Sequence, residues 1–355
     1  MTDILPFLKS LLSVSGLSGF EGPAARLIEE KWHPLVDEIQ VSRVGSLHGL
    51  KKGSGKEPRP SIMIAAHMDA IGLMVSQIQD GFLHVTNLGG VDIRVLPGLE
   101  VIVHASGSVE ELPGVIAMPP SQLLPEKEGD GVIALKHLLV DTGLTPQQVE
   151  KKVQVGDLVS FANEPLVLAG DVLSGHSVDN RASVAALTVC LEELHRVQHA
   201  WDVYAVATVQ EEETLMGGFT SPFEIRPQIA VAVDVTHAKG PGASDWRTVP
   251  LGKGCTLDWG PNTHPVLYEA FRSLAERLDM PYQPSVYPSG SGTDAMGMQI
   301  VAEGIPTMVV SIPLRYMHTP VELVSYKDIT RAGHLLAQFI AGLELDFVEK
   351  LKYED

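Results

Sequence analysis

The sequence predicts an α/β fold, in which a mainly parallel mixed sheet carries helices on both faces, with an inserted small β-barrel or sandwich domain. Almost uniformly apolar runs, typical of strands buried on both faces of a parallel sheet, alternate with segments of helical periodicity. Between the first two runs, short strands are divided by Gly and Pro, which favours a small antiparallel barrel or sandwich. The apolar runs cover residues 61–66, 203–209, 229–235 and 306–312.

The N-terminal part predicts two helices and a loop. Thr2 is expected to cap a short amphipathic helix that ends near Gly16. Residues 23–32 predict a second helix, because apolar residues recur on one of its faces. The polar, Gly- and Pro-rich segment 51–60 is a loop. The first buried strand follows and leads into His67-Met68-Asp69.

The pattern changes after this strand. Short strands are predicted in FLHVTNL, LEVIVHA, GVIAM and DLVSFA. One helix interrupts them, and Thr145 with Gln148 forms a capping-box arrangement at its start. We therefore predict an inserted β-rich domain and a larger α/β domain formed by the segments on either side of it. The α/β domain covers residues 1–67 and 166–355, and the insertion covers residues 68–165.

Behind the insertion the alternation of helices and strands resumes. A helix is predicted to begin at Asp179, with apolar positions at helical spacing up to Leu194. Another is predicted over residues 265–278, and a Gly- and Ser-rich turn, PSGSGTDA, precedes the last buried strand. A final helix carries the apolar residues of segment 335–340.

Composition excludes several classes of partner. The chain has 355 residues, with 26 Lys and Arg against 44 Asp and Glu, which gives a net charge of −18. So acidic a surface argues against nucleic acid and anionic membranes as partners. The two cysteines cannot form a disulfide framework, so a cytoplasmic location is expected. The N-terminal segment lacks the basic region and cleavage site of a signal peptide, and no apolar run is long enough to span a bilayer.

Three adjacent glutamates, Glu211, Glu212 and Glu213, follow the apolar run 203–209. Adjacent negative charges at the end of a buried strand repel one another and lose hydration, so they are costly unless a cation lies among them. An isolated run of this kind is usually a solvated turn. Here the other strand ends argue against a simple turn, because they also carry residues that bind metals.

Candidate metal ligands stand at the ends of the apolar runs or at a helix start. In an open parallel sheet such residues converge at the carboxyl ends of the strands. Two histidines and three carboxylates suit zinc, cobalt or manganese rather than calcium. They exceed what one catalytic ion needs and fit two divalent ions, about 3.5–4 Å apart, that share a bridging carboxylate. The candidates are His67, Asp179, Glu212, Asp234 and His318.

Short stretches covering nearly the whole chain occur in the order known from one family: AHMDAIGLMV, LGGVD, PGVIAMPP, VDNRAS, VQEEETLMGG, VAVDVTHA, LGKG, SGTDAMGMQ and RYMHTPVE. Each stretch is weak alone, but together they are specific. The chain resembles the tetrahedral (TET) aminopeptidases and glutamyl aminopeptidases, metallopeptidase family forty-two. The resemblance implies a zinc-peptidase type of α/β domain. It also implies an insertion that drives dimerisation, with the dimers assembling into a hollow tetrahedral dodecamer.

The resemblance also implies a role for each candidate ligand. His67, Asp179 and Asp234 would hold one metal ion. Asp179, Glu212 and His318 would hold the other, so that Asp179 bridges the two ions. Zinc or cobalt is the expected metal, and manganese is a further candidate.

Two more residues receive roles by the same resemblance. Asp69 would hydrogen-bond His67 and fix its orientation, and Glu211 would be the general base that acts on a metal-bridging water. This chain reads QEEETLMG where family members usually read QEEVGLRG. Gln210 and Gly217 set the register used here, and the alternative is a slip by one residue, with Glu212 as base and Glu213 as ligand.

The predicted function is therefore that of a dinuclear metal-dependent aminopeptidase, which removes N-terminal residues from peptides. One alternative is a glycosidase of endoglucanase type that uses paired carboxylates and needs no metal cluster. Another is an inactive shell-forming scaffold. Among nearby residues, His176 is expected to be a solvated loop histidine and Asp92 a turn residue. Thr293 and Asp294 are expected to cap a helix that begins at Ala295.

Overall fold

The larger part of the molecule is built on a sheet of eleven strands. The computed structural model describes residues 3–123 and 131–352. The strands of this sheet are β1 (Glu38–Val41), β2 (Leu47–Lys51), β3 (Ser61–His67), β10 (Leu166–Leu168), β11 (Val172–Gly175), β12 (Asp202–Thr208), β13 (Ile229–His237), β14 (Thr256–Trp259), β15 (Gln283–Val286), β16 (Thr307–Arg315) and β17 (Glu322–Ser325). Their main path runs β1-β2-β12-β3-β13-β16-β17-β11-β10, and β14 joins β15 to β16.

Strand direction divides the sheet into a centre and two edges. β3 pairs in parallel with β12 and β13, and β13 pairs in parallel with β16. The remaining neighbours along the main path are antiparallel. The prediction of a mainly parallel sheet is therefore correct only for the four central strands. The antiparallel edges make the whole a mixed sheet, which agrees with that part of the prediction.

The central strands are buried on both faces, which explains why their sequences are uniformly apolar rather than alternating. In β3, Ile62 and Ile64 belong to the core on one face of the sheet. Met63 and Ala65, the residues between and after them, belong to the core on the other face. Successive side chains of a strand point to opposite faces, so one short apolar run supplies both cores.

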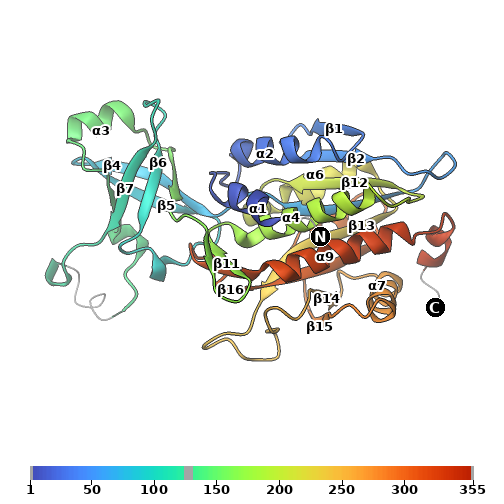
Figure 1. The fold of residues 1–355 in the computed structure, drawn as a ribbon. Coiled ribbons are helices and arrows are strands. Elements are labelled where there is room, and N and C mark those ends of the chain that lie inside the picture. Colours follow the sequence, from blue (N-terminus) through green and yellow to red (C-terminus); the bar gives the residue numbers. More distant parts are fainter. Residues whose placement is uncertain (1–2, 124–130, 353–355) are drawn as a thin grey trace.

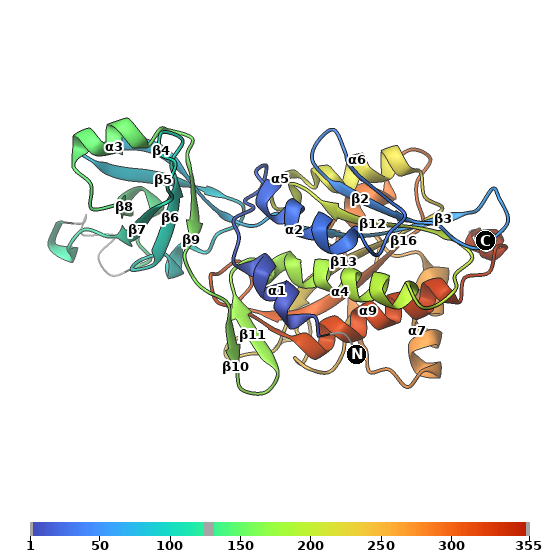
Figure 2. The same ribbon diagram turned by 45° about the horizontal axis from the view of Figure 1, so that its top comes forward.

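Helices cover both faces, as predicted (Figure 2). One face carries α1 (Leu5–Leu12), α2 (Gly22–Trp32), α4 (Val178–Leu194), α7 (Pro265–Arg277) and α9 (Tyr326–Ala341). The other carries α6 (Met216–Ile225) and α8 (Ala295–Gln299), which pack against β12, β13 and β16. The first helix is shorter than predicted, and its expected cap Thr2 lies outside the described residues. None of the described helices is long and apolar enough to cross a membrane.

A closed six-stranded barrel stands beside the sheet, at the left of Figure 1. Its strands are β4 (Gly72–Gln79), β5 (Phe82–Leu88), β6 (Glu100–His104), β7 (Leu112–Ala117), β8 (Leu139–Asp141) and β9 (Leu158–Phe161), in the order β4-β5-β8-β7-β6-β9. The barrel has a core of its own, to which Leu73, Val101 and Val159 belong. Helix α3 (Pro146–Lys152) begins with the predicted capping box of Thr145 and Gln148.

The chain crosses between sheet and barrel twice. Residues 68–71 lead from β3 into β4, and residues 162–165 lead from β9 back to β10. The first crossing starts directly behind His67, so the barrel is attached at the carboxyl edge of the central strands. This edge is where ligands are expected to bind in an open parallel sheet.

Candidate metal centre

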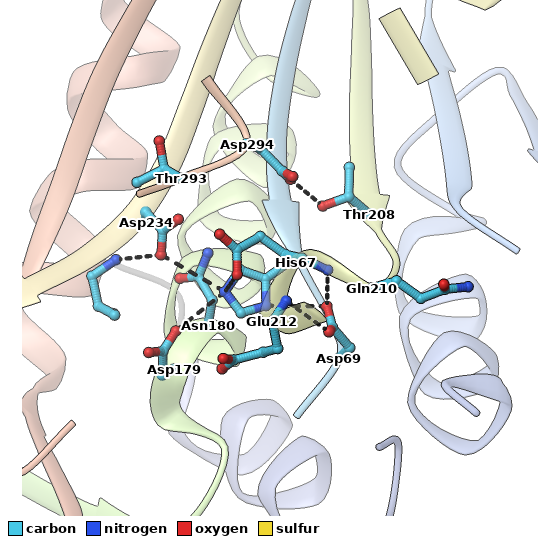
Figure 3. A network of polar contacts seen from close by, with 12 residues as sticks. His67, Asp69, Asp179, Asn180, Thr208, Gln210, Glu212, Asp234, Thr293 and Asp294 are labelled. Atoms are coloured by element: carbon cyan, nitrogen blue, oxygen red, sulfur yellow. Dashed lines mark hydrogen bonds and ion pairs between the residues drawn. The ribbon is translucent and has the colours of Figure 1, made fainter. Parts of the chain in front are cut away.

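The carboxyl ends of the central strands bring the predicted site residues together. His67 ends β3, and Asp234 lies near the end of β13. Glu211 and Glu212 open the short helix α5 (Glu211–Thr214) directly after β12. Figure 3 shows the side chains of His67, Glu212 and Asp234 close together, with Asp179 beside them. These elements are adjacent in the sheet, so residues far apart in the sequence meet at one edge.

Asp179 lies between the two histidines. Its Oδ1 atom is 3.2 Å from Nε2 of His67, and its Oδ2 atom is 3.7 Å from Nε2 of His318. On the outer side, Oε2 of Glu212 lies 3.5 Å from Nε2 of His318. On the inner side, Oδ1 of Asp234 lies 3.8 Å from Nε2 of His67. The two histidines therefore lie on either side of the Asp179 carboxylate, and Glu212 and Asp234 each lie beside one of these histidines.

In the described part of the chain, two sets of donor atoms are close enough to hold an ion. One set is His67, Glu211 and Asp234, and the other is His67, Asp179 and Glu212. These sets overlap the predicted ones but differ in two respects. Glu211, predicted as a base, stands among the donors, with Oε2 3.6 Å from Nε2 of His67. His318 is in neither set and lies at the rim, where 36% of its side chain is exposed.

Asp69 lies beside His67 and also bonds to the backbone of the two glutamates. Its Oδ1 atom lies 3.3 Å from Nδ1 of His67. The same carboxylate also accepts the backbone N–H groups of Glu211 at 3.1 Å and Glu212 at 3.2 Å. Asp69 is fully buried, so it is a fixed support for one histidine and two glutamates at once.

The three glutamates point in different directions. Oε2 of Glu211 faces His67, and Oε2 of Glu212 faces His318. Glu213 is exposed and turns away, and its Oε1 accepts the N–H of Gly89 at 2.6 Å. This geometry favours Glu212 over Glu213 as a ligand and thus the register chosen from Gln210 and Gly217.

Comparison with known proteins identifies the family of this chain. The family model of the M42 glutamyl aminopeptidases matches residues 45–335, most of its length. The chain belongs to the M42 glutamyl aminopeptidase family. It is thus an aminopeptidase by family, a hydrolase that acts on peptides.

Relatives of this M42 chain match it over nearly their whole length. A lysyl aminopeptidase of Pyrococcus furiosus is 33% identical, and the match covers 96% of this chain and 98% of the relative. A TET aminopeptidase from a marine sediment Thaumarchaeota archaeon is 31% identical with a TM-score of 0.90, covering 98% and 99%. The TET1 peptidase of Pyrococcus horikoshii is 28% identical with a TM-score of 0.83, covering 96% and 100%; it can assemble into a tetrahedron or a large octahedral shell.

The M42 site holds more negative charge than its own residues neutralise. Burial raises the pKa of Glu211 to about 9; His67 opposes this shift, and Asp234 reinforces it. Burial also raises the pKa of Glu212 and of Asp234 well above the ordinary range. For His67, burial lowers the pKa, but the surrounding carboxylates, Glu211 first, raise it well above its ordinary value. A crowded set of buried carboxylates favours a bound cation.

A cavity of about 400 Å³ opens beside this cluster in the M42 chain. Beyond the candidate ligands and Glu211, its walls are neutral side chains and His237. Tyr287 is part of this wall, and its hydroxyl lies 2.7 Å from Oγ1 of Thr236. The carboxylate cluster therefore lines a cavity of the size in which small ligands bind.

A loop of the inserted segment reaches the M42 site, which sequence reasoning missed. Asp92 was expected to be only a turn residue, and its side chain does bond to Arg94. Its backbone N–H, however, donates to the carbonyl oxygen of His318 at 3.2 Å. A Cβ atom on Gly90 would lie 2.6 Å from Nδ1 of His318, so only glycine leaves room for that ring. The motif LGGVD was the available signal.

Two expectations about neighbouring residues are wrong. His176 is buried rather than solvated, with Nδ1 2.6 Å from Oγ of Ser177, and burial lowers its pKa to about 3. Asp294 does not cap the following helix with its side chain. Its Oδ2 atom instead accepts the hydroxyl of Thr208 at 2.5 Å (Figure 3). Thr293 does act as expected, accepting the N–H of Ala295 through Oγ1 at 3.3 Å.

Proposed function

We propose that this M42 chain is a dinuclear metal-dependent aminopeptidase that removes N-terminal residues from peptides. The observation that carries the proposal is the place of Asp179. Each of its carboxylate oxygens faces a different histidine: Oδ1 lies 3.2 Å from Nε2 of His67, and Oδ2 lies 3.7 Å from Nε2 of His318. A carboxylate in that position suits a bridge between two ions better than a ligand of one.

The residues present fit such a pair of ions. The donors are imidazole nitrogens and carboxylate oxygens, a set that suits zinc, cobalt or manganese. We assign His67, Asp179 and Asp234 to one ion, and Asp179, Glu212 and His318 to the other. The raised pKa values of Glu212 and Asp234 support this assignment, because bound cations would offset the charge that these buried groups cannot otherwise share.

Each nearby side chain then has a defined task. Metal ions of this kind, when bound, polarise a carbonyl group and make water more acidic. Glu211 would take a proton from the attacking water and return it to the leaving amine as the peptide C–N bond breaks and the new C–O bond forms. Asp69 would hold His67 and the backbone of both glutamates in place. Family membership favours this function over the glycosidase alternative, which would need no histidine cluster.

Metal removal tests the function directly. We expect purified protein to hold two divalent ions per chain and to release amino acids from chromogenic amino-acyl substrates. Chelation should abolish this release, and added zinc, cobalt or manganese should restore it. Metal content is measured by elemental analysis, and the release of amino acids is assayed on the same samples. Full activity in protein with no detectable metal would rule the proposal out.

We further propose that the chain forms homo-oligomers through the barrel, in line with the tetrahedral assembly of the Pyrococcus horikoshii relative. Outward-facing residues of β7 are apolar: Val115 is 46% exposed, and Met118 just beyond the strand is 53% exposed. Exposed apolar side chains grouped along one strand are typical of a protein interface. The free thiols of Cys190 and Cys255 agree with a cytoplasmic location for such particles.

A charge placed among these apolar side chains should break the assembly. We expect Val115→Glu to lower the particle mass measured by light scattering, because a carboxylate buried in an interface is unpaired. Val197→Glu, which adds the same charge at a residue 38% exposed behind α4, serves as the matched control and should leave the mass unchanged. An unchanged mass for Val115→Glu would show that this face of the barrel is not an interface.

A further inference from the structure

A second buried carboxylate, Glu322, contacts the backbone of two proposed ligands that Asp69 does not bind. It is the first residue of β17 and is 1% exposed. Its Oε2 atom accepts the backbone N–H of Asp179 at 3.0 Å, and its Oε1 atom accepts that of His318 at 2.9 Å. One side chain thereby binds the backbones of two proposed ligands that are far apart in the sequence.

The backbone at both places is in a conformation that needs such support. His318 has a φ angle of +64°, and Ser177, two residues before Asp179, has a φ angle of +60°. Residues other than glycine adopt this left-handed region only at a cost in free energy, so the surrounding structure must hold them there. The hydrogen bonds that Glu322 accepts from the N–H groups of Asp179 and His318 help to hold the two segments in this conformation.

No cation competes with these two hydrogen bonds for the oxygens of Glu322. Among residues 3–123 and 131–352, no Lys, Arg or His forms an ion pair with this carboxylate. The buried cation nearby, Arg181, is attracted by Asp69 and Glu322 but donates to backbone carbonyl groups, those of Leu11 and Val14 among them. Its charge offsets those of the two carboxylates without occupying their acceptor atoms.

Asp69 and Glu322 thus form a matched pair. Asp69 accepts the N–H groups of Glu211 and Glu212, and Glu322 accepts those of Asp179 and His318. We propose that Glu322 is a positioning residue, which sets the distance between Asp179 and His318 so that both reach the same ion. This inference rests on the proposed metal-dependent function.

Glu322→Gln tests the proposal. Glutamine keeps one oxygen but turns an amide N–H₂ group toward the backbone N–H of Asp179 or His318, and two donors cannot bond. We expect affinity for one of the two cobalt ions to fall about 10- to 100-fold, the usual loss when a partner behind a metal ligand is removed. Cobalt titration followed by visible absorption measures the affinity and reports the coordination of the ion.

Asp328 provides the matched control. It is equally buried and also accepts two backbone N–H groups, those of Gly252 at 2.6 Å and Gly254 at 2.8 Å, but it does not line the cavity. Asp328→Asn is expected to lower the unfolding temperature of metal-free protein while leaving cobalt affinity unchanged. A positioning role for Glu322 therefore requires the loss of affinity, and a loss of thermal stability alone would contradict it.

The outcomes separate the two proposals. Wild-type protein that takes up no cobalt would refute the metal centre itself, before any variant is considered. With a cobalt-binding wild type, Glu322→Gln affinities within about twofold of the wild-type values would overturn the role of Glu322, because support for a ligand is typically worth more. If Glu322→Gln does not fold, Glu322→Asp replaces it. Aspartate keeps both acceptors but is one methylene too short to reach both segments, so the same criterion applies.

Discussion

Glu211→Gln should retain both metal ions, keep a similar KM and lose about 10²–10⁴-fold in kcat, the usual effect of removing a general base. The side chain of Glu211 faces His67 at 3.6 Å from within the carboxylate cluster. Glutamine has nearly the same volume and leaves the proposed ligands unchanged, but it cannot accept a proton at neutral pH. Metal content and steady-state kinetics on one preparation are the measurements.

Two neighbouring variants show whether Glu211 is correctly assigned. Glu213→Gln should be nearly silent, because Glu213 is exposed and its Oε1 accepts the N–H of Gly89 instead of facing either histidine. Glu212→Gln should lower metal content, because that carboxylate faces His318 at 3.5 Å. An active Glu211→Gln, together with a Glu212→Gln that binds both ions but is inactive, would move the base to Glu212. Metal loss in Glu211→Gln would instead make Glu211 a ligand, as one of the donor sets allows.

The sequence predicts well what depends on local composition. The strands β3, β12, β13 and β16 are buried on both faces, and burial of this kind leaves a run of apolar letters that needs no knowledge of partners. Their parallel order places their carboxyl ends at one edge, so His67, Glu212 and Asp234 were expected to meet. The structure places them there.

The edges of the sheet were harder to predict for a physical reason. Strands such as β10, only three residues long and exposed throughout, have no apolar periodicity to distinguish them from a loop. Their direction depends on pairing with β11, whose partner β17 comes about 150 residues later. No local pattern contains that register, which is why the sheet was expected to be mainly parallel and its antiparallel edge strands were not located.

The supporting residues of the site were missed for a related reason. Glu322 and Asp92 act through backbone N–H groups, which every residue except proline carries. The residue that supplies such a backbone group can be of almost any type, so its identity in the sequence does not indicate the contact. Candidate ligands were recognisable because metals require particular side chains, whereas the residues that orient them are recognised only when the contacts are visible.

Asp179→Asn should have the largest effect on metal binding, weakening both ions at once. The proposed bridge uses one oxygen of Asp179 toward His67 and the other toward His318. Asparagine keeps the shape but replaces one oxygen with an amide group that cannot act as a ligand, and it removes the charge that both ions share. The bond from the backbone N–H of Asp179 to Glu322 is retained, so the segment should stay folded.

Asp234→Asn is the informative comparison, because Asp234 lies 3.8 Å from His67 and is assigned to that ion alone. Elemental analysis after dialysis at defined metal concentration should find both ions depleted in Asp179→Asn and mainly one depleted in Asp234→Asn. The affinity loss in Asp179→Asn should exceed the about 10- to 100-fold typical of residues that only support a ligand. If Asp179→Asn loses a single ion and holds the other normally, the carboxylate does not bridge. The two-ion arrangement would then need another bridge, and Glu211 is the carboxylate of the two donor sets that is not yet assigned to an ion.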